Sequence, residues 1–341
     1  MKRYDLVIMI GRFQPFHIGH QKTIQRALEL GDKAMVIIGS ANQPRTIKNP
    51  WTAQERAIML SCDLSRDDQK RLIVKAVSDQ MPNNQKWATN VQQQVDEVLR
   101  GWSDKPKRIG LIGYKKDESS YYLDMFPQWE FIETDHIEMI NASDIRKNYF
   151  TQPLLFTKAV VPAKVFNFLE EFRKTSEYDR LYLEWLVIEN YKKSWEAAPY
   201  PPTFVTADAV VIQSGHVLLI TRKKGALGGG LKALPGGFVN QKEQIVDAMV
   251  RELREETRLK VPAPVIKGNI KAKEVFDHPD RSLRGRTVTH AFLVELPAGP
   301  LPVVKGSDDA DDARWIPISR VCEDEMFEDH YQIIQHFLGR I

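Results

Sequence analysis

The chain of 341 residues is 43% hydrophobic and 27% charged, a composition typical of folded globular proteins that excludes extended disorder. Its length exceeds what one hydrophobic core usually organises, so we expect two domains. With 48 basic and 45 acidic residues, the net charge of +3 gives no indication of a surface for nucleic acids or anionic membranes.

Short β-branched segments alternate with helical patterns through the first half of the chain. We predict strands over residues 4–10, 34–40, 71–77, 108–113 and 130–133. Apolar residues recur at helical spacing between them, which predicts helices over residues 19–30, 52–64 and 87–99. This alternation implies a parallel sheet with helices on both faces, and therefore an α/β Rossmann-like domain over residues 1–160.

The pattern changes in the middle of the chain. Residues 162–195 are helical without intervening strands and lead into a Pro-rich segment at 197–202, so we assign 161–200 to a helical segment and linker. Residues 201–341 form the second predicted domain, with strands over 207–213, 216–222, 272–276 and 287–295 and a helix over 244–257. This mixture predicts an α+β fold.

The first strand leads directly into residues 11–20, Gly-Arg-Phe-Gln-Pro-Phe-His-Ile-Gly-His, at the start of a helix. Gly11 would let a ligand approach the backbone, and the free N–H groups of a helix N-terminus attract phosphate. His17 and His20 would hydrogen-bond a polyphosphate and stabilise the charge that develops on it. Two histidines at this spacing could instead only cap the helix or pack.

These ten residues resemble the Gly-x-Phe-x-Pro-x-His-x-Gly-His signature of the nucleotidylyltransferase superfamily. Residues 49–56 look like the Asn-Pro-aromatic-Thr-x-x-Glu-Arg segment of the archaeal-type nicotinamide mononucleotide (NMN) adenylyltransferases, although Thr52 and Glu55 also fit a purely structural capping box. Residues 140–146 resemble the family's Ile-Ser-x-Thr-x-x-Arg motif. The resemblance implies that ATP is bound by Gly11, Arg12, Phe13, His17, His20, Ser143 and Arg146.

Residues 83–87 are similar to the family's Asn-x-x-Trp stretch, which implies that Asn84 and Trp87 bind NMN, with the indole stacked on the nicotinamide ring. Without the family, a Trp at a helix start is more often a core anchor. The implied reaction gives NAD and pyrophosphate, with His17, His20 and Arg146 as catalytic residues and Mg2+ bridging the triphosphate.

The second domain carries three glutamates at helical spacing, Glu252, Glu255 and Glu256, which share one helical face. Such carboxylates would bind a divalent cation that holds a pyrophosphate and activates water. A solvated acidic face is the alternative.

The surrounding residues, 237–259, resemble the Nudix box. The resemblance implies that the three glutamates are metal ligands, that Glu255 is also catalytic, and that the site is supported by Gly237, Glu243 and Arg251. Mg2+ is the expected ion, with Mn2+ as an alternative. Arg258 stands where the family usually has Gly. This departure affects the expected geometry at the end of the helix more than the metal site.

Residues 282–287 and 308–310, together with Trp315, look like segments of the ADP-ribose pyrophosphatase branch. They imply that Arg284 and Arg286 bind ADP-ribose, whereas the alternative for these arginines is a solvated hairpin. The catalytic base stays open between Asp308, Asp309 and a glutamate of the box.

The order of the motifs is similar to that of the bacterial bifunctional NMN adenylyltransferase/Nudix hydrolases. The resemblance implies NAD synthesis by the first domain and hydrolysis of ADP-ribose to AMP and ribose 5-phosphate by the second. Two alternatives stay open: a second domain that only senses ADP-ribose or cleaves another nucleoside diphosphate derivative, and a first domain that serves another acceptor. The expected partners are ATP, NMN and ADP-ribose, without nucleic acid or membrane, and a homo-oligomer is left open.

The two cysteines, Cys62 and Cys322, indicate neither a disulfide framework nor a zinc site and favour a reducing compartment. The first apolar run, residues 6–10, is too short for a signal-peptide core, and no segment approaches the ~20 apolar residues that cross a bilayer. We therefore expect a cytoplasmic protein.

Overall fold

The computed structural model describes residues 3–79, 84–102, 108–115, 118–134, 141–307 and 310–339. The chain divides into two compact units, Met1–Tyr182 and Leu183–Ile341. The division falls within helix α8 (Ser176–Lys193), which lies inside the helical segment predicted over residues 161–200. Among the described residues, no helix combines the length and the apolar character needed to cross a membrane.

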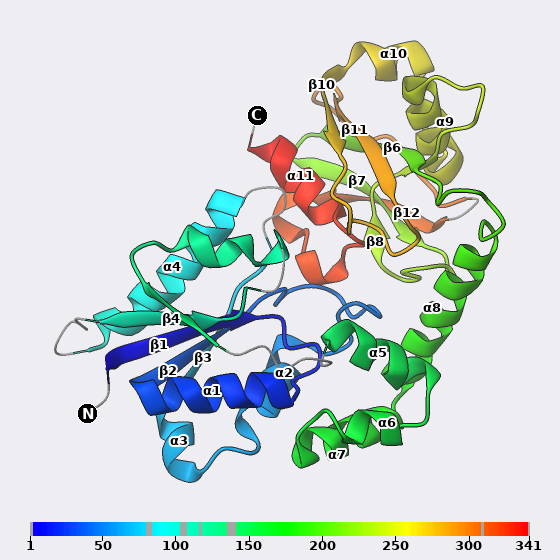
Figure 1. Cartoon of the computed structure of the whole chain (residues 1–341). Coiled ribbons are helices and arrows are strands. Elements are labelled where there is room, and N and C mark those ends of the chain that lie inside the picture. The colour runs from blue at the N-terminus through cyan, green and yellow to red at the C-terminus, as the bar shows by residue number, and fades with distance from the viewer. Residues whose placement is uncertain are drawn as a thin grey trace. The chain divides into compact units, whose positions relative to one another are not determined.

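The first unit contains a five-stranded parallel sheet, as the alternating pattern predicts (Figure 1). Its strands lie in the order β3-β2-β1-β4-β5, and all neighbours run parallel. The order reverses between β1 and β4, and ligands usually bind at such a switch point, at the carboxyl ends of the strands. The bounds of the strands are Tyr4–Gly11, Gly31–Ile38, Leu72–Ala76, Ile109–Gly113 and Glu130–Glu133.

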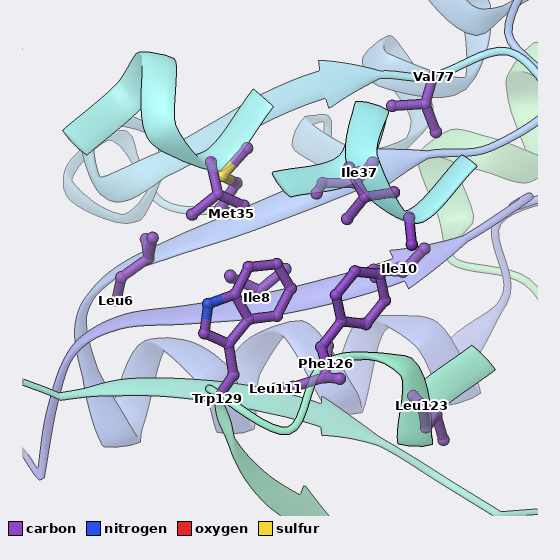
Figure 2. Close-up of a cluster of buried hydrophobic side chains, with 13 residues drawn as sticks. Leu6, Ile8, Ile10, Met35, Ile37, Val77, Leu111, Leu123, Phe126 and Trp129 are labelled. Carbon is purple, nitrogen blue, oxygen red and sulfur yellow. The ribbon is translucent and has the colours of Figure 1, made fainter. Parts of the chain in front are cut away.

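Helices cover both faces of this sheet (Figure 1). Successive residues of a strand point to opposite faces, so Leu6, Ile8 and Ile10 of β1 share one face, where helix α4 (Asn84–Arg100) packs its apolar side. Figure 2 shows Phe126 and Trp129 over the same face, with ring centroids 4.7 Å apart. Helix α1 (Ile18–Leu30) buries Ile24, Ala27 and Leu28 on the other side.

The remaining helices of the first unit are short. The helix predicted over 52–64 ends at Ser61, and a second helix begins after Ser65, whose hydroxyl accepts a hydrogen bond from the Asp68 N–H at 3.1 Å. The sequence pattern merged the two because both lie between the same strands. These helices are α2 (Ala53–Ser61), α3 (Arg66–Arg71), η1 (Glu118–Met125), α5 (Ala142–Thr151), α6 (Leu155–Lys158) and α7 (Ala163–Phe172).

The second unit has a mixed seven-stranded sheet, which confirms the predicted α+β fold. The main path is β10-β11-β6-β7-β12, with β8 beside β7 and β9 beside β6. The pair β11 and β6 is parallel, whereas the other pairs are antiparallel. The bounds are Phe204–Gln213, His216–Arg222, Lys232–Ala233, Gly236–Phe238, Ile270–Phe276, Thr287–Glu295 and Ala310–Pro317, from β6 to β12.

Two helices cover the two faces of this sheet. Helix α9 (Ile245–Thr257) packs Met249 and Leu253 on Ala207, Ala209 and other small residues of β6. Helix α11 (His330–Leu338) packs its apolar side on the alternate residues of the same strand. Short helices α10 (Ala263–Gly268), η2 (Ile318–Arg320) and η3 (Glu323–Glu325) complete the unit. Helix α9, which carries the three glutamates, is therefore anchored to the sheet by its apolar face.

Candidate active sites

The turn between β1 and α1 carries two stacked histidines. His17 is the N-cap of α1: its Nδ1 accepts the N–H of His20 and the Nδ1 of His20 accepts the N–H of His17, both at 3.4 Å. The two ring centroids are 3.6 Å apart. Because each Nδ1 accepts, each Nε2 carries the proton and is the atom left to donate to a ligand.

Burial keeps both imidazoles neutral. It lowers the pKa of His17 to about 4, and burial together with the neighbouring His17 lowers the pKa of His20 well below its ordinary value. Both capping and ligand binding are thus compatible with this geometry, since capping uses Nδ1 and leaves Nε2.

The backbone at the end of β1 is shaped by Gly11 and Phe13. A Cβ atom at Gly11 would lie 2.9 Å from the Phe13 ring, so the absence of a side chain makes room for this ring rather than for a ligand on that side. Phe13 itself has a φ of 54°, in the left-handed region, and its side chain is buried. Arg12, between them, is exposed.

Arg146 joins helix α5 to this turn. Its Nη1 donates to the Gln14 carbonyl at 2.6 Å and its Nη2 donates to the Ser143 hydroxyl at 3.0 Å. Burial and the nearby charge of Arg12 lower the pKa of Arg146 to about 10, so the guanidinium stays charged at neutral pH. The structure therefore brings together the two segments that the sequence assigns to ATP.

Arg56, in α2, is a positioning residue that the sequence reading passed over. Its side chain is 1% exposed and donates to the carbonyls of Arg12 and Gly39, both at 2.7 Å, and to that of Ser40 at 3.0 Å. It thus joins the ends of β1 and β2. The predicted capping box of Thr52 and Glu55 is confirmed. This local explanation of residues 49–56 left the role of Arg56 unnoticed.

The residues assigned to NMN lie at the start of α4. Trp87 is half-buried and packs on the core, with ring centroids 6.1 Å from Tyr122 and 5.9 Å from Phe126. Asn84 is exposed in the first turn, and residue 83 lies outside the described residues. Burial raises the pKa of Tyr122 and the charge of Arg12 opposes this shift, which places Arg12 near the same aromatic group.

In the second unit, Arg251 is the centre of an ion-pair cluster on α9. Its Nε and Nη2 donate to the two carboxylate oxygens of Glu243 at 2.8 and 3.0 Å, and its Nη1 donates to Glu252 at 2.7 Å and Glu255 at 3.0 Å. A further bond, of 3.1 Å, joins Nη2 to the Phe238 carbonyl. These bonds raise the pKa of Arg251 and lower that of Glu243.

The glutamates differ in their surroundings. Burial raises the pKa of Glu252, and it raises that of Glu256 to about 8 even though Glu256 accepts the Gly236 N–H at 2.9 Å. A Cβ atom at Gly237 would lie 2.5 Å from a Glu252 carboxylate oxygen, so a side chain here would displace this carboxylate. Glu255 is half-exposed. Within the described ranges, no three acidic, His or Cys side chains converge as a ready metal site.

A second buried carboxylate, Asp208, lies beside this helix and was not found from the sequence. The Thr289 hydroxyl donates to it, and burial raises its pKa to about 6. A Cβ atom at Gly236 would lie 2.3 Å from its Oδ1. An acidic residue inside an otherwise apolar strand is the signal that identifies such a position.

The two arginines assigned to ADP-ribose are placed differently. Arg284 lies over the Phe238 ring, 5.1 Å from its centroid, next to the strand that borders α9. Arg286 donates to the Asp277 carbonyl and lies 3.8 Å from the Asp277 carboxylate, so it is held within its own hairpin. The Trp315 indole donates to the Pro302 carbonyl at 2.9 Å, whereas Asp308 and Asp309 lie outside the described residues.

The chain matches two protein families and several known proteins. Residues 8–148 match the family described as Cytidylyltransferase-like, and residues 202–337 match the NUDIX domain. The nicotinamide/nicotinic acid mononucleotide adenylyltransferase of Acinetobacter baylyi is 37% identical over 182 residues, which cover 53% of this chain and 93% of that protein. The ADP-ribose pyrophosphatase of Methanocaldococcus jannaschii is 33% identical over 134 residues, which cover 39% of this chain and 72% of that protein.

A solved structure matches almost the whole chain. It is a bifunctional NMN adenylyltransferase/ADP ribose pyrophosphatase from Francisella tularensis, complexed with AMP and a manganese ion. The TM-score is 0.90 at 35% sequence identity, and the match covers 99% of each chain. The similarity therefore extends through both units.

Proposed function

This chain belongs to the bifunctional NMN adenylyltransferase/ADP-ribose pyrophosphatase family, and we propose that its two units carry these two reactions at the two sites described above. The first unit transfers AMP from ATP to NMN and releases pyrophosphate. The second unit hydrolyses ADP-ribose to AMP and ribose 5-phosphate. Matches to relatives of both kinds weigh against another acceptor in the first unit and against a second unit that only senses its ligand.

The proposal for the first unit is supported by the convergence of His17, His20 and Arg146 at the switch point of the parallel sheet. The two Nε2 atoms and the guanidinium would hold the triphosphate of ATP. The 5′-phosphate of NMN attacks the α-phosphorus, the bond to the oxygen that bridges to the β-phosphorus breaks, and pyrophosphate leaves. Donors on the triphosphate stabilise the charge that develops on pyrophosphate.

We assign the NMN ring to the start of α4, with Asn84 for the amide and Trp87 for stacking. Trp87 is half-buried, so its buried part fixes the indole against the core while its exposed part can contact a ligand. The Arg12 guanidinium, near Tyr122, would lie between the mononucleotide and the triphosphate. Positioning of the two reactants is the main contribution of these residues.

The glutamate face of the second unit fits a divalent ion. Three carboxylates on one face supply the oxygen atoms that Mg2+ and Mn2+ prefer. Burial raises the pKa values of Glu252 and Glu256, and a bound cation would offset this cost of keeping them charged. We propose that Glu252, Glu255 and Glu256 hold the ion, with Mg2+ as the expected metal. When bound, the ion neutralises diphosphate charge and makes its water more acidic.

Hydrolysis then needs a proton acceptor, for which we propose Glu255, the most exposed of the three. Water attacks one phosphorus of ADP-ribose, the bridging P–O bond breaks, and AMP and ribose 5-phosphate leave. Arg251 is the positioning residue, because its bonds to Glu243 and the Phe238 carbonyl hold the guanidinium while Glu252 and Glu255 turn to the ion.

The test uses one protein with two active sites. The purified chain is incubated with Mg2+ and either ATP plus NMN or ADP-ribose, and the products are separated by chromatography. We expect His20→Ala to lose NAD formation and keep AMP release, and Glu255→Gln to do the reverse. Failure of the wild-type protein to form NAD, or to release AMP from ADP-ribose, refutes the corresponding half of the proposal.

The proposed partners are therefore the small molecules ATP, NMN and ADP-ribose. A cytoplasmic location, which the small number of cysteines favours, is part of the same proposal because both reactions use nucleotides of the cell interior.

A further inference from the structure

Helix α8 carries apolar side chains on two opposite sides. Leu181 and Ile188, which are 0% and 1% exposed, share one side because they lie about two turns apart. The other side carries four large apolar side chains that are 38–63% exposed, here called the apolar stripe: Tyr182, Leu183, Leu186 and Val187. A helix that is apolar all round is normally covered all round. The stripe therefore indicates a surface that binds a partner.

The apolar stripe differs from the other exposed apolar residues of the protein. Along the described part of the chain, every other exposed large apolar residue stands alone in the sequence or, at Leu155 and Phe156, in a pair. Single exposed apolar residues are common on protein surfaces, whereas a contiguous group of them marks an interaction site. The four residues of the stripe lie within about two turns of one helix, so they form such a group.

The apolar stripe lies at the middle of α8. The helix runs from Ser176 to Lys193, and the four residues are placed symmetrically about its midpoint. Two copies of the helix that pack antiparallel across a two-fold axis at this point bring Leu183 of each copy against Leu186 of the other. Tyr182 and Val187 meet in the same way. A two-fold interface needs this self-complementary pattern, because each pair of residues occurs in it twice.

The two ends of α8 carry opposite charges. Glu177 and Asp179 lie in the first turn and Lys192 and Lys193 in the last turn, and all four are exposed. Antiparallel pairing places the acidic turn of each copy beside the basic turn of the other, whereas parallel pairing places like charges together. The Lys192 ammonium lies 3.8 Å from Glu189, and a surface pair at this distance contributes too little to compete. The charges therefore favour the antiparallel arrangement.

We propose that the apolar stripe is a dimerisation surface, and that its partner is the α8 helix of a second copy of this chain, packed antiparallel. Leu183 and Leu186 form the centre of the contact. The contact follows one helix of about 27 Å, so we expect a dissociation constant of about 1–100 µM rather than an obligate dimer. The inference does not depend on either proposed activity, because no residue of the stripe belongs to the two sites.

The first test is sedimentation equilibrium of the full chain over a concentration range of about 1–200 µM, which spans the expected dissociation constant. We expect the wild-type protein to show a monomer–dimer equilibrium. Leu183→Glu/Leu186→Glu places carboxylates opposite each other at the centre, so it should raise the dissociation constant at least about 100-fold. A wild-type protein that stays monomeric throughout would overturn the proposal and assign the stripe to another partner or to another part of the chain.

A charge exchange tests the direction of the two helices. In Leu183→Glu/Leu186→Lys, antiparallel pairing sets the glutamate of each copy against the lysine of the other, so the dissociation constant should be at least about tenfold lower than in the variant with two glutamates. Parallel pairing would set glutamate against glutamate and lysine against lysine. Equal dissociation constants for the two variants would therefore refute antiparallel pairing.

The matched control is Val265→Glu/Val303→Glu, which also replaces two exposed apolar residues by glutamate, outside α8. It should keep the wild-type dissociation constant. A control that loses the dimer as well would show that association depends on net charge and not on the stripe, which contradicts the proposal. Urea unfolding followed by circular dichroism should give wild-type midpoints for all three variants, so that loss of the dimer cannot come from unfolding.

Discussion

Replacing Arg56 by lysine tests whether one buried side chain holds the ATP turn in place. The guanidinium donates to four backbone carbonyls: that of Thr52 before its own helix, and those of Arg12, Gly39 and Ser40, which belong to the ends of two neighbouring strands. Burial lowers the pKa of Arg56 to about 10, but the group stays charged at neutral pH. Lysine keeps the charge and loses the planar set of donors.

The magnitude follows from the carbonyls that lose their partner. A single ammonium nitrogen reaches one or two of the three acceptors at the strand ends, and each buried acceptor left without a partner costs about 1–3 kcal/mol. We expect Arg56→Lys to lower the free energy of unfolding of the first unit by about 2–4 kcal/mol, a large part of the roughly 5–15 kcal/mol that stabilises a domain. NAD synthesis should fall because Arg12 and the turn behind it shift.

The second unit provides an internal control. Each activity is measured after equilibration in increasing urea, so the loss of NAD synthesis reports the first unit and the loss of ADP-ribose hydrolysis reports the second. Only the first midpoint should move. The control is Arg26→Lys, at an exposed position where the guanidinium pairs with Glu29 at 2.9 Å; it should change the free energy of unfolding of either unit by less than about 0.5 kcal/mol. Equal midpoints for Arg56→Lys and wild type would refute this account of the turn.

Three further predictions concern single residues. Arg258 ends α9 with a φ of 52°, a left-handed conformation that favours glycine. Arg258→Gly should therefore raise the free energy of unfolding of the second unit in urea by about 1 kcal/mol, whereas Arg258→Ala should not. An unchanged free energy with glycine would show that the backbone is not strained at Arg258. Because burial raises the Glu256 pKa from 4.5 to about 8, the metal-free second unit should lose stability as pH rises through that range, by at most about 1.4 kcal/mol per pH unit. Glu256→Gln should flatten this slope, and an unchanged slope would exclude Glu256 as its origin. Trp87→Phe should raise the KM for NMN with little change in unfolding, whereas Trp87→Ala should also cost about 3–5 kcal/mol of stability; an unchanged KM in both would make Trp87 purely structural.

Local patterns in the sequence predict much of this structure, because the contacts concerned lie close together along the chain. The alternation of strands and helices gives the Rossmann-like sheet, and the helical spacing of Glu252, Glu255 and Glu256 places them on one face of α9. The capping box at Thr52 depends on residues three apart. Such features follow from backbone geometry alone.

What the sequence misses depends on contacts between distant segments. Arg56 meets the carbonyl of Arg12, 44 positions away, and no periodicity records that bond. Strand β12 pairs with β7 across more than eighty residues, and its alternation is broken by charged side chains. Tertiary packing decides these positions. Gly11 is different, because its neighbour in space is the ring of Phe13, only two residues further on, and not the open approach that a glycine suggests.

The arginines of the two sites have different partners, so the two sites differ in how much positive charge is left for a phosphate ligand. In the first unit, Arg56 and Arg146 donate mainly to backbone carbonyls, which carry no net charge, so their positive charge still acts on a triphosphate. In the second, Arg251 donates to three carboxylates, which more than cancel it. An acidic site of this kind repels a diphosphate unless cations are added. The divalent ion would supply this positive charge at the scissile bond.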